Sequence, residues 1–368
     1  MAKRIGLITA GGDCPGLNAV IRAVAKPAMR EGFEVLGIYD GFLGLIENRM
    51  HVLSWAEVSG ILAQGGTILG SSNKANPARF AVGIGADGKA IMEDRRPQCL
   101  ELIRREKIET LIVAGGDGSM TIASELAAAA HQAGHSLNVM GVPKTIDNDL
   151  EGTEITFGFQ TAVSIAAEAI DRVKTTAASH HRVMVVEVMG RNAGWIALHA
   201  GVATGSDVIL IPEIPFDFDA IADCVRVRSR HGKRYSIVCV AEGAKPRGGQ
   251  LFVSKVDPTS PDPIRLGGVG KAVADEIEKR TGIESRYVVL GHVQRGGTPV
   301  ADDRVLSTLL GERAIAMVLE GKRDRMAAVQ RGRLTDVDIN LPCGKQRTVP
   351  KDDPVMRAAL ELETHFGD

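Results

Sequence analysis

Short runs of glycine, aspartate and hydroxyl side chains recur in this sequence in patterns suited to phosphate chemistry. Residues 115–119 read GGDGS, in which the glycines would let backbone N–H groups approach a phosphate closely. Asp117 is placed to reach a Mg²⁺ ion that bridges phosphate oxygens, and Ser119 is placed to cap a helix that begins at Met120. The alternative is a glycine-rich turn whose aspartate caps a backbone amide. The run favours binding of nucleotide phosphates and does not identify the acceptor.

A second run, PKTIDND at residues 143–149, places two carboxylates and an amide directly after an apolar segment. Two acids beside polyanionic phosphates would repel them unless a metal ion and cations lie near. A carboxylate beside a sugar hydroxyl, by contrast, can accept the hydroxyl proton during phosphoryl transfer. An Asx-rich turn is the alternative. The run predicts a catalytic carboxylate next to a metal-bound phosphate.

A third run, GGDCPGLN at residues 11–18, leads from an apolar segment into a helical pattern. It is either a phosphate site at a helix N-terminus or an ordinary strand–helix turn. The run matches neither GxGxxG nor GxxxxGK[ST], so the common dinucleotide and P-loop fingerprints are absent. Without GxGxxG and an acid about 20 residues further on, a dehydrogenase is disfavoured.

Four arginines lie at the ends of two apolar runs. Arg182 and Arg191 bracket residues 183–188, and Arg286 and Arg295 bracket residues 287–290. A single arginine is usually a solvated surface residue, but a guanidinium can hold a phosphate through two parallel hydrogen bonds. Four of them in a chain with several phosphate-type runs favour phosphate binding.

Two other polar side chains also follow apolar runs. His292 is either a core histidine or a ligand of a sugar phosphate, and Glu242 could hold sugar hydroxyls. Neither residue decides between these alternatives by itself.

The elements that must position these groups alternate between apolar strand candidates and longer helical patterns. The strand candidates are residues 5–9, 34–38, 110–113, 138–142, 183–188, 208–211, 236–241 and 287–290. The helix candidates are residues 18–31, 55–64, 120–133, 161–177, 219–230, 271–281 and 303–319. This alternation predicts an α/β fold with parallel sheets, in which ligands bind beyond the carboxyl ends of the strands. Polar or glycine-rich runs follow six of the strand candidates, as that rule requires.

Composition bounds the class of protein. The chain of 368 residues has 44 Lys and Arg against 45 Asp and Glu, which gives no sign of a nucleic-acid partner. Its five cysteines are widely separated and odd in number, which favours a reducing compartment. The apolar run near the N-terminus is too short for a signal peptide, and no stretch approaches the roughly 20 apolar residues of a membrane span. We therefore expect a soluble, cytoplasmic protein with no membrane partner.

Taken together, these runs resemble those of bacterial-type phosphofructokinases. The resemblance extends from residue 5 to about residue 303 and is densest in GGDCPGLNAVIR, GIYDGFLGL, GGTILGSS, GGDGS, PKTIDND, EVMGR, AEG and GHVQRGG. It implies two domains of Rossmann-like parallel-sheet sandwiches, the phosphofructokinase fold. It also implies a glycolytic kinase, usually a homotetramer (a homodimer is the alternative), that phosphorylates the 1-hydroxyl of fructose 6-phosphate with ATP and Mg²⁺.

The predicted domain boundaries lie near residues 157–161, with a return crossing near residues 294–303. Residues 1–158 plus about 294–345 would form the nucleotide-binding domain. Residues 159–293 plus part of the C-terminal tail would form the sugar-phosphate domain.

The resemblance also implies a role for each site residue. Asp147 would be the general base for the sugar hydroxyl, with Asp117 as a Mg²⁺ ligand and Asp149 supporting the metal site. The other residues expected at the reacting phosphoryl group are Thr145, Lys144 and Arg191. Those expected at the nucleotide are Gly12, Asn73, Lys74, Gly116, Asp117, Gly118 and Ser119. Those expected at the sugar phosphate are Thr145, Asp147, Met189, Gly190, Arg191, Glu242, His292 and Arg295, joined by Arg182 and Arg286 from a neighbouring subunit.

The phosphoryl donor is less clearly indicated, because the signature is mixed. Asn73, followed by Lys74, stands where many ATP-using members have arginine. Lys144 resembles the pyrophosphate-using branch, whereas Gly118 resembles the ATP users, since an aspartate there would crowd and repel the nucleotide α-phosphate. We give Gly118 more weight and predict ATP, with pyrophosphate as the alternative. A non-catalytic sugar-phosphate sensor is a third alternative, and the presence of Asp147 and Asp117 counts against it.

Overall fold

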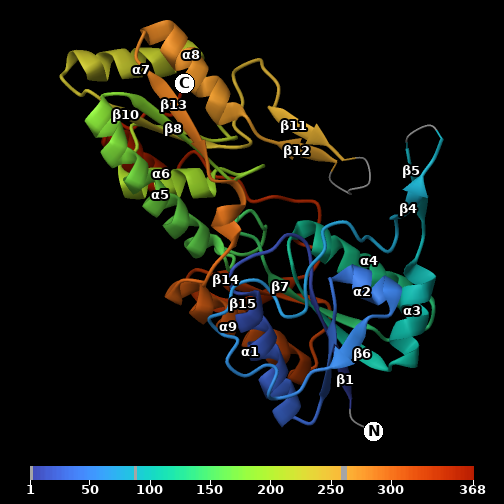
Figure 1. Ribbon diagram of the computed structural model, residues 1–368. Coiled ribbons are helices and arrows are strands. Elements are labelled where there is room, and N and C mark those ends of the chain that lie inside the picture. The colour runs from blue at the N-terminus through green and yellow to red at the C-terminus, as the bar shows by residue number, and fades with distance from the viewer. Residues whose placement is uncertain (1–2, 87–88, 258–262) are drawn as a thin grey trace.

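The computed structural model describes residues 3–86, 89–257 and 263–368 of the chain. Two parts, each built on a β-sheet with helices on both faces, lie one above the other (Figure 1). The predicted α/β fold with parallel sheets is thus confirmed. Its inner strands are apolar and buried because helices exclude water from both of their faces, whereas most of the strands at the sheet edges are partly exposed.

Seven strands within the described residues form the larger sheet, in the order β15-β14-β7-β6-β1-β2-β3. The edge strands β3 and β15 are antiparallel to their neighbours and the other strands are parallel. The strand bounds are β1 Arg4–Thr9, β2 Glu34–Ile38, β3 Met50–Val52, β6 Ile108–Gly115, β7 Asn138–Pro143, β14 Arg325–Gln330 and β15 Arg333–Asp338. One face packs on α1 (Leu17–Arg30) and α9 (Ala301–Leu319). The other packs on α2 (Phe42–Glu47), α3 (Arg96–Arg105) and α4 (Asp117–Gln132).

The smaller sheet is entirely parallel, in the order β13-β8-β10-β9. Its strands are β8 Val183–Val188, β9 Val208–Leu210, β10 Ser236–Ala241 and β13 Ser285–Val289. The helices α5 (Phe159–His180) and α6 (Trp195–Thr204) cover one face. The helices α7 (Phe218–Arg230) and α8 (Val269–Thr281) cover the other. A 3₁₀ turn, η1 (Gly291–Arg295), follows β13, and α10 (Pro354–Glu361) packs against α6.

Two antiparallel hairpins project from the two parts on the same side of the molecule (Figure 1). The first joins β4 (Phe80–Ile84) to β5 (Ala90–Glu93), and the second joins β11 (Val253–Val256) to β12 (Ile264–Leu266). None of these four strands is among the strand candidates of the sequence, because most of their residues are exposed and carry no buried apolar pattern.

One predicted helix, residues 55–64, is wrong. The segment forms a series of turns instead, and Gly60 within it has a φ of 81°, in the left-handed region that interrupts a right-handed helix. Only Val58 and Ile61 of this segment are buried. The segment therefore contributes two side chains to the core, whereas an amphipathic helix would bury a whole face.

Buried Asp303 joins the two segments, near residues 157–161 and 294–303, where the chain passes between the two parts. Its carboxylate accepts hydrogen bonds from the backbone N–H groups of Gly158, at 2.9 Å, and Thr161, at 2.7 Å. The Thr161 hydroxyl also donates to it. Asp303 at the start of α9 therefore caps the start of α5, and burial raises the pKa of its carboxyl. The two predicted crossings thus meet at one side chain, while the domain assignment built on them stays a prediction.

We predict that Asp303→Ala lowers the free energy of unfolding by about 3 kcal/mol, because two buried N–H groups and a hydroxyl lose their acceptor. Urea unfolding of the full chain measures this change. Asp302→Ala is the matched control, since Asp302 is the exposed neighbour in the same helical turn. Equal effects of the two substitutions would contradict the assignment.

Candidate active site

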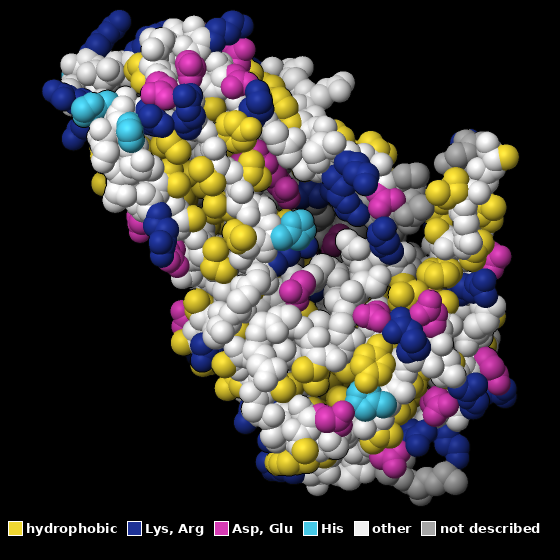
Figure 2. Space-filling model, in the orientation of Figure 1, with side chains coloured by type: hydrophobic (Ala, Val, Ile, Leu, Met, Phe, Trp, Pro, Cys, Tyr) yellow, Lys and Arg dark blue, Asp and Glu magenta, His cyan; other side chains and the backbone are white. Residues whose placement is uncertain are grey.

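A cleft of about 950 Å³ lies between the two sheets, where the loops that follow their strands converge. Figure 2 shows this hollow, with cationic, acidic and histidine side chains along its edge. The loops after β1, β6 and β7 approach from one part, and those after β8, β10 and β13 from the other. Most predicted site residues line it: Gly12, Asn73, Gly116, Asp117, Gly118, Ser119, Lys144, Thr145, Asp147, Asp149, Met189, Arg191, Glu242, His292 and Arg295.

Three predicted cations do not line this cleft. Lys74 lies beside it in an ion pair with Asp257, at 3.2 Å. Arg182 and Arg286 pair with Glu284, at 3.3 and 2.6 Å. Both arginines stand at the amino ends of β8 and β13, whereas the cleft lies beyond the carboxyl ends of those strands. Their predicted contact with a neighbouring subunit's site stays a prediction.

The glycine-rich turn after β6 leads directly into α4. That helix begins at Asp117, with Gly116 at its N-cap position and no side-chain cap, so the prediction that Ser119 caps a helix at Met120 is wrong. Ser119 lies instead in the first helical turn, and its side chain faces the cleft. A Cβ added at Gly118 would meet no atom within 4 Å, so this position borders open space. The arrangement directs the N-terminus of a 16-residue helix at the cleft, where an anion is favoured.

The turn after β1, at Gly11 and Gly12, is in close contact with three other segments of the cleft lining. Lys144 is buried, and its ammonium donates to the backbone oxygen of Gly12 at 2.9 Å. A Cβ at Gly12 would lie only 2.5 Å from Nη1 of Arg295, so a glycine is needed for the guanidinium to pack there. The Ser71 hydroxyl donates to the oxygen of Gly11, at 2.6 Å, which brings the segment carrying Asn73 to the same place.

The loop after β7 holds its carboxylates in place through backbone and amide hydrogen bonds. Asn148 adopts a left-handed conformation, with φ 53°, and its side-chain oxygen accepts from the N–H of Thr156 at 3.0 Å. The Thr156 hydroxyl donates to the oxygen of Thr145 at 2.6 Å. Arg347 donates to the backbone oxygens of Asn148 and Asp149, at 2.9 and 2.8 Å. These contacts fix the path of the chain on both sides of Asp147.

The carboxylates of this loop have strongly shifted pKa values. Burial raises the pKa of Asp147 to about 6, against the opposing effect of Arg295. Burial and the neighbouring Asp147 and Asp117 raise the pKa of Asp149 to about 7. Burial lowers the pKa of the Lys144 ammonium. The Asp147 carboxylate lines the cleft, and its buried Oδ1 has no hydrogen-bond partner within the described residues, so that oxygen receives no protein donor from this part of the chain.

On the opposite wall, two loops of the smaller sheet are in backbone contact. A Cβ at Gly243 would lie 1.9 Å from the backbone oxygen of Arg191, so the loop that carries Glu242 requires glycine next to it. The N–H of Gly243 donates to the backbone oxygen of Gly190 at 3.1 Å, which places Gly190 directly behind the cleft wall. Burial raises the pKa of the Glu242 carboxyl.

Gln294 connects these loops to η1. Its buried side chain accepts from the N–H of Met189, at 3.3 Å, and donates to the oxygen of Gly291, at 3.0 Å. This bridge fixes the spacing between Met189 and the two cationic or polar side chains of η1, His292 and Arg295. The wall can therefore present a cation, an imidazole and a carboxylate to one anionic, hydroxyl-bearing ligand.

The oxygen ligands needed for Mg²⁺ are present on the opposite side. Asp117 and Asp149 both line the cleft. They are close enough to each other for the charge of Asp117 to raise the pKa of Asp149. Within the described residues, no group of three or more acidic, histidine or cysteine side chains could hold a metal by itself. Two carboxylates suit a Mg²⁺ ion that takes its remaining oxygen ligands from phosphate and water.

Several cleft residues were missed in the sequence. They are Gly11, Phe42, Ser72, Ala75, Ile122, Asn192, Ser254, Lys255, Ile264, Arg265, Leu266 and Gln346. Five of them belong to the hairpin of β11 and β12, which has no apolar strand pattern to indicate its position. Gly11, Phe42 and Ser72 lie within recognised motifs and Asn192 directly follows one, so proximity in sequence could have identified them.

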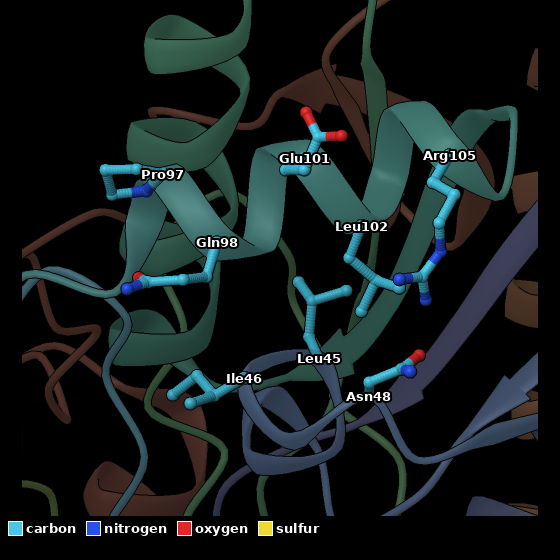
Figure 3. Close-up of a pocket in the computed structure, with 8 residues that line it drawn as sticks. All are labelled: Leu45, Ile46, Asn48, Pro97, Gln98, Glu101, Leu102 and Arg105. Atoms are coloured by element: carbon cyan, nitrogen blue, oxygen red, sulfur yellow. The ribbon is translucent and has the colours of Figure 1, made fainter.

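A second cavity, of about 420 Å³, lies between α2 and α3 on the flank of the larger sheet (Figure 3). Its lining combines Leu45, Ile46, Pro97 and Leu102 with a few polar side chains, of which Glu101 and Arg105 are opposite in charge. It has no glycine-rich strand end and no cluster of cations. The cleft between the sheets is therefore the candidate active site.

We predict that Asn148→Ala lowers the free energy of unfolding by about 2 kcal/mol and Asn148→Gly by about 1 kcal/mol. Both variants lose the acceptor for Thr156, but only alanine is strained at a φ of 53°. Urea unfolding of the two variants separates these contributions. If glycine proves as destabilising as alanine, the left-handed conformation has no role in holding the loop.

Comparison with known proteins gives a consistent result. A sequence model of the family described as Phosphofructokinase matches residues 4–318 of the chain. The ATP-dependent 6-phosphofructokinase 2 of Clostridium perfringens (strain 13 / Type A) is 45% identical to this chain over 368 residues, covering 100% of this chain and 99% of that protein.

Solved structures show the same architecture. The T-state phosphofructokinase of Pichia pastoris is 34% identical, with a TM-score of 0.78, and the match covers 92% of this chain and 37% of that one. A pyrophosphate-dependent phosphofructokinase from Nitrosospira multiformis has a TM-score of 0.82 over 100% of this chain and 93% of that one, and at 22% identity it shows the shared fold alone. The predicted fold and family resemblance are confirmed.

Proposed function

The chain belongs to the phosphofructokinase family, and we propose that it transfers the terminal phosphoryl group of ATP to the 1-hydroxyl of fructose 6-phosphate, giving fructose 1,6-bisphosphate and ADP in glycolysis. One observation carries the proposal. The carboxylate of Asp147 lines a cleft between the start of a helix and a cationic wall, and one of its oxygens, the buried Oδ1, has no partner within the described residues.

In this mechanism Asp147 acts as the general base. Its carboxylate accepts the proton of the sugar 1-hydroxyl as the hydroxyl oxygen forms a bond to the terminal phosphorus and the bond from phosphorus to the leaving ADP oxygen breaks. The raised pKa of Asp147 makes it a stronger base than an ordinary aspartate while leaving it ionised near neutrality.

Charge develops on the transferred phosphoryl oxygens, and the cations of the cleft are placed to stabilise it. We assign this role to Lys144 and Arg191, with Thr145 positioning the group. The turn at Gly116–Ser119 and the residues Gly12 and Asn73 would hold the nucleotide phosphates. Asp117 and Asp149 would hold Mg²⁺, which supplies positive charge to the phosphate oxygens when bound.

The sugar phosphate would lie on the wall formed by the smaller sheet. Met189, Arg191 and Glu242 would contact its ring, and His292 and Arg295 its phosphate, with Gly190 supporting the wall from behind. Arg182 and Arg286 cannot serve their own cleft from the far ends of β8 and β13, so we assign them to the sugar site of a neighbouring subunit in a homotetramer or homodimer. Lys74 pairs with Asp257, and its ammonium has further N–H donors that could contact the nucleotide.

A cytoplasmic location goes with this role and stays a prediction. In the described part of the chain, every helix falls short of the length and apolar character that a membrane crossing requires.

ATP is the donor that we expect, and pyrophosphate is the alternative. Initial rates with each donor, at saturating fructose 6-phosphate and Mg²⁺, decide between them. The open space beside Gly118 accommodates a nucleotide, so ATP should support the faster reaction. As a matched variant, Gly118→Asp should fold normally and lose most ATP-dependent activity, because its carboxylate would repel the donor phosphates. Full activity with pyrophosphate and none with ATP would reverse the assignment.

We predict that Asp147→Ser lowers kcat by about 10² or more, within the range for loss of a general base. Binding of fructose 6-phosphate, measured by calorimetry without donor, should be largely kept, because the cationic wall is intact. Unchanged turnover would remove Asp147 from the mechanism. Binding of the sugar phosphate without any turnover in the unsubstituted chain would support a sensor instead.

A further inference from the structure

The hairpin of β11 and β12 forms one wall of the cleft, although no motif in its sequence indicates a ligand. Ser254, Lys255, Ile264, Arg265 and Leu266 all line the cleft. They lie on the two described strands of the hairpin, which projects from the smaller part of the molecule (Figure 1).

The pairing register places two cations side by side on this wall. Lys255 and Arg265 are direct partners across the antiparallel hairpin, so their side chains emerge on the same face of the ribbon. Two cations on the same face of the ribbon can contact one polyanionic ligand, such as a chain of phosphates.

Both sides of the cleft hold this wall in position. The backbone oxygen of Ile264, next to Arg265, accepts a hydrogen bond from Nη1 of Arg191 at 2.9 Å. Asp257, at the end of the other strand, pairs with Lys74 of the larger part at 3.2 Å. The hairpin therefore lies between the residue assigned to the transferred phosphoryl group and the segment assigned to the nucleotide.

The base of the hairpin is also fixed. Glu187 in β8 is buried, and its carboxylate accepts from the N–H groups of Gly268, at 3.3 Å, and Gly270, at 2.8 Å. These groups belong to the start of α8, which follows β12 directly. The cations are thus carried on an element anchored in the core of the smaller sheet.

We propose that Lys255 and Arg265 bind the phosphate chain of the phosphoryl donor from the side opposite the Gly116–Ser119 turn, and so help to set donor affinity. The proposal rests on the proposed function, and it adds two donor-binding residues to that reaction. It assigns the hairpin to the donor and not to the sugar phosphate, because Asp257 joins it to the nucleotide segment.

The test compares Lys255→Gln, Arg265→Gln and the double variant with the unsubstituted full chain. Lys271→Gln is the matched control, since Lys271 is an exposed cation just beyond the hairpin that pairs with Asp275 outside the cleft. Steady-state kinetics give KM for ATP and for fructose 6-phosphate, and calorimetry gives the dissociation constant for ATP without sugar. Arg265→Lys keeps the charge and should recover most of the affinity that Arg265→Gln loses.

We expect each single glutamine variant to raise KM and the dissociation constant for ATP by about tenfold, as for loss of a charge-assisted hydrogen bond. The KM for fructose 6-phosphate and all constants of Lys271→Gln should stay within about twofold. Unchanged ATP constants, or a change confined to fructose 6-phosphate, would overturn the proposal. An unsubstituted chain without ATP-dependent activity would instead contradict the proposed function.

Discussion

Burial of two neighbouring carboxylates is the constraint on which the rest of the cleft depends. Asp147 and Asp149 are two residues apart in one loop, and loss of water raises the pKa values of both, with the charge of Asp147 adding to the rise at Asp149. Such a pair is stable only where cations and fixed dipoles surround it. Lys144 and Arg295 provide that surrounding charge, and a metal ion bound with substrate would add to it.

The fold meets this constraint by bringing the strand ends of two parallel sheets together. One sheet contributes the carboxylates and the start of α4, and the other contributes Arg191, Glu242 and the side chains of η1. The larger sheet carries the two aspartates and one counter-charge, Lys144, whereas Arg295 comes from the smaller part. The contact of Arg295 with Gly12 and the capping of α5 by Asp303 keep the two sets at a fixed separation. The geometry of the site is therefore a property of the interface between the two parts.

Much of the fold could be predicted because its strands carry a strong local signal. Buried parallel strands must be apolar on both faces, and the eight predicted strands all overlap strands of the two sheets. The errors occur where tertiary contacts overrule local preference. Residues 55–64 have a helical composition, but Gly60 turns the chain so that Val58 and Ile61 reach the core. Ser119 is a residue type typical of helix caps, but α4 begins two residues before it, with Gly116 at the N-cap position.

The sequence by itself determined the chemistry of the site, because phosphate binding and proton transfer need particular side chains in loops that directly follow strands. Those groups are local in sequence, so GGDGS, PKTIDND and the strand-end arginines could be recognised without a structure. Only the tertiary structure decided which distant residues join them. It showed that Arg182 and Arg286 face away from their own cleft, and that Lys255 and Arg265 lie within it. The reason is physical: the direction of a side chain depends on how its strand is packed and paired, and neither is encoded by the few residues around it.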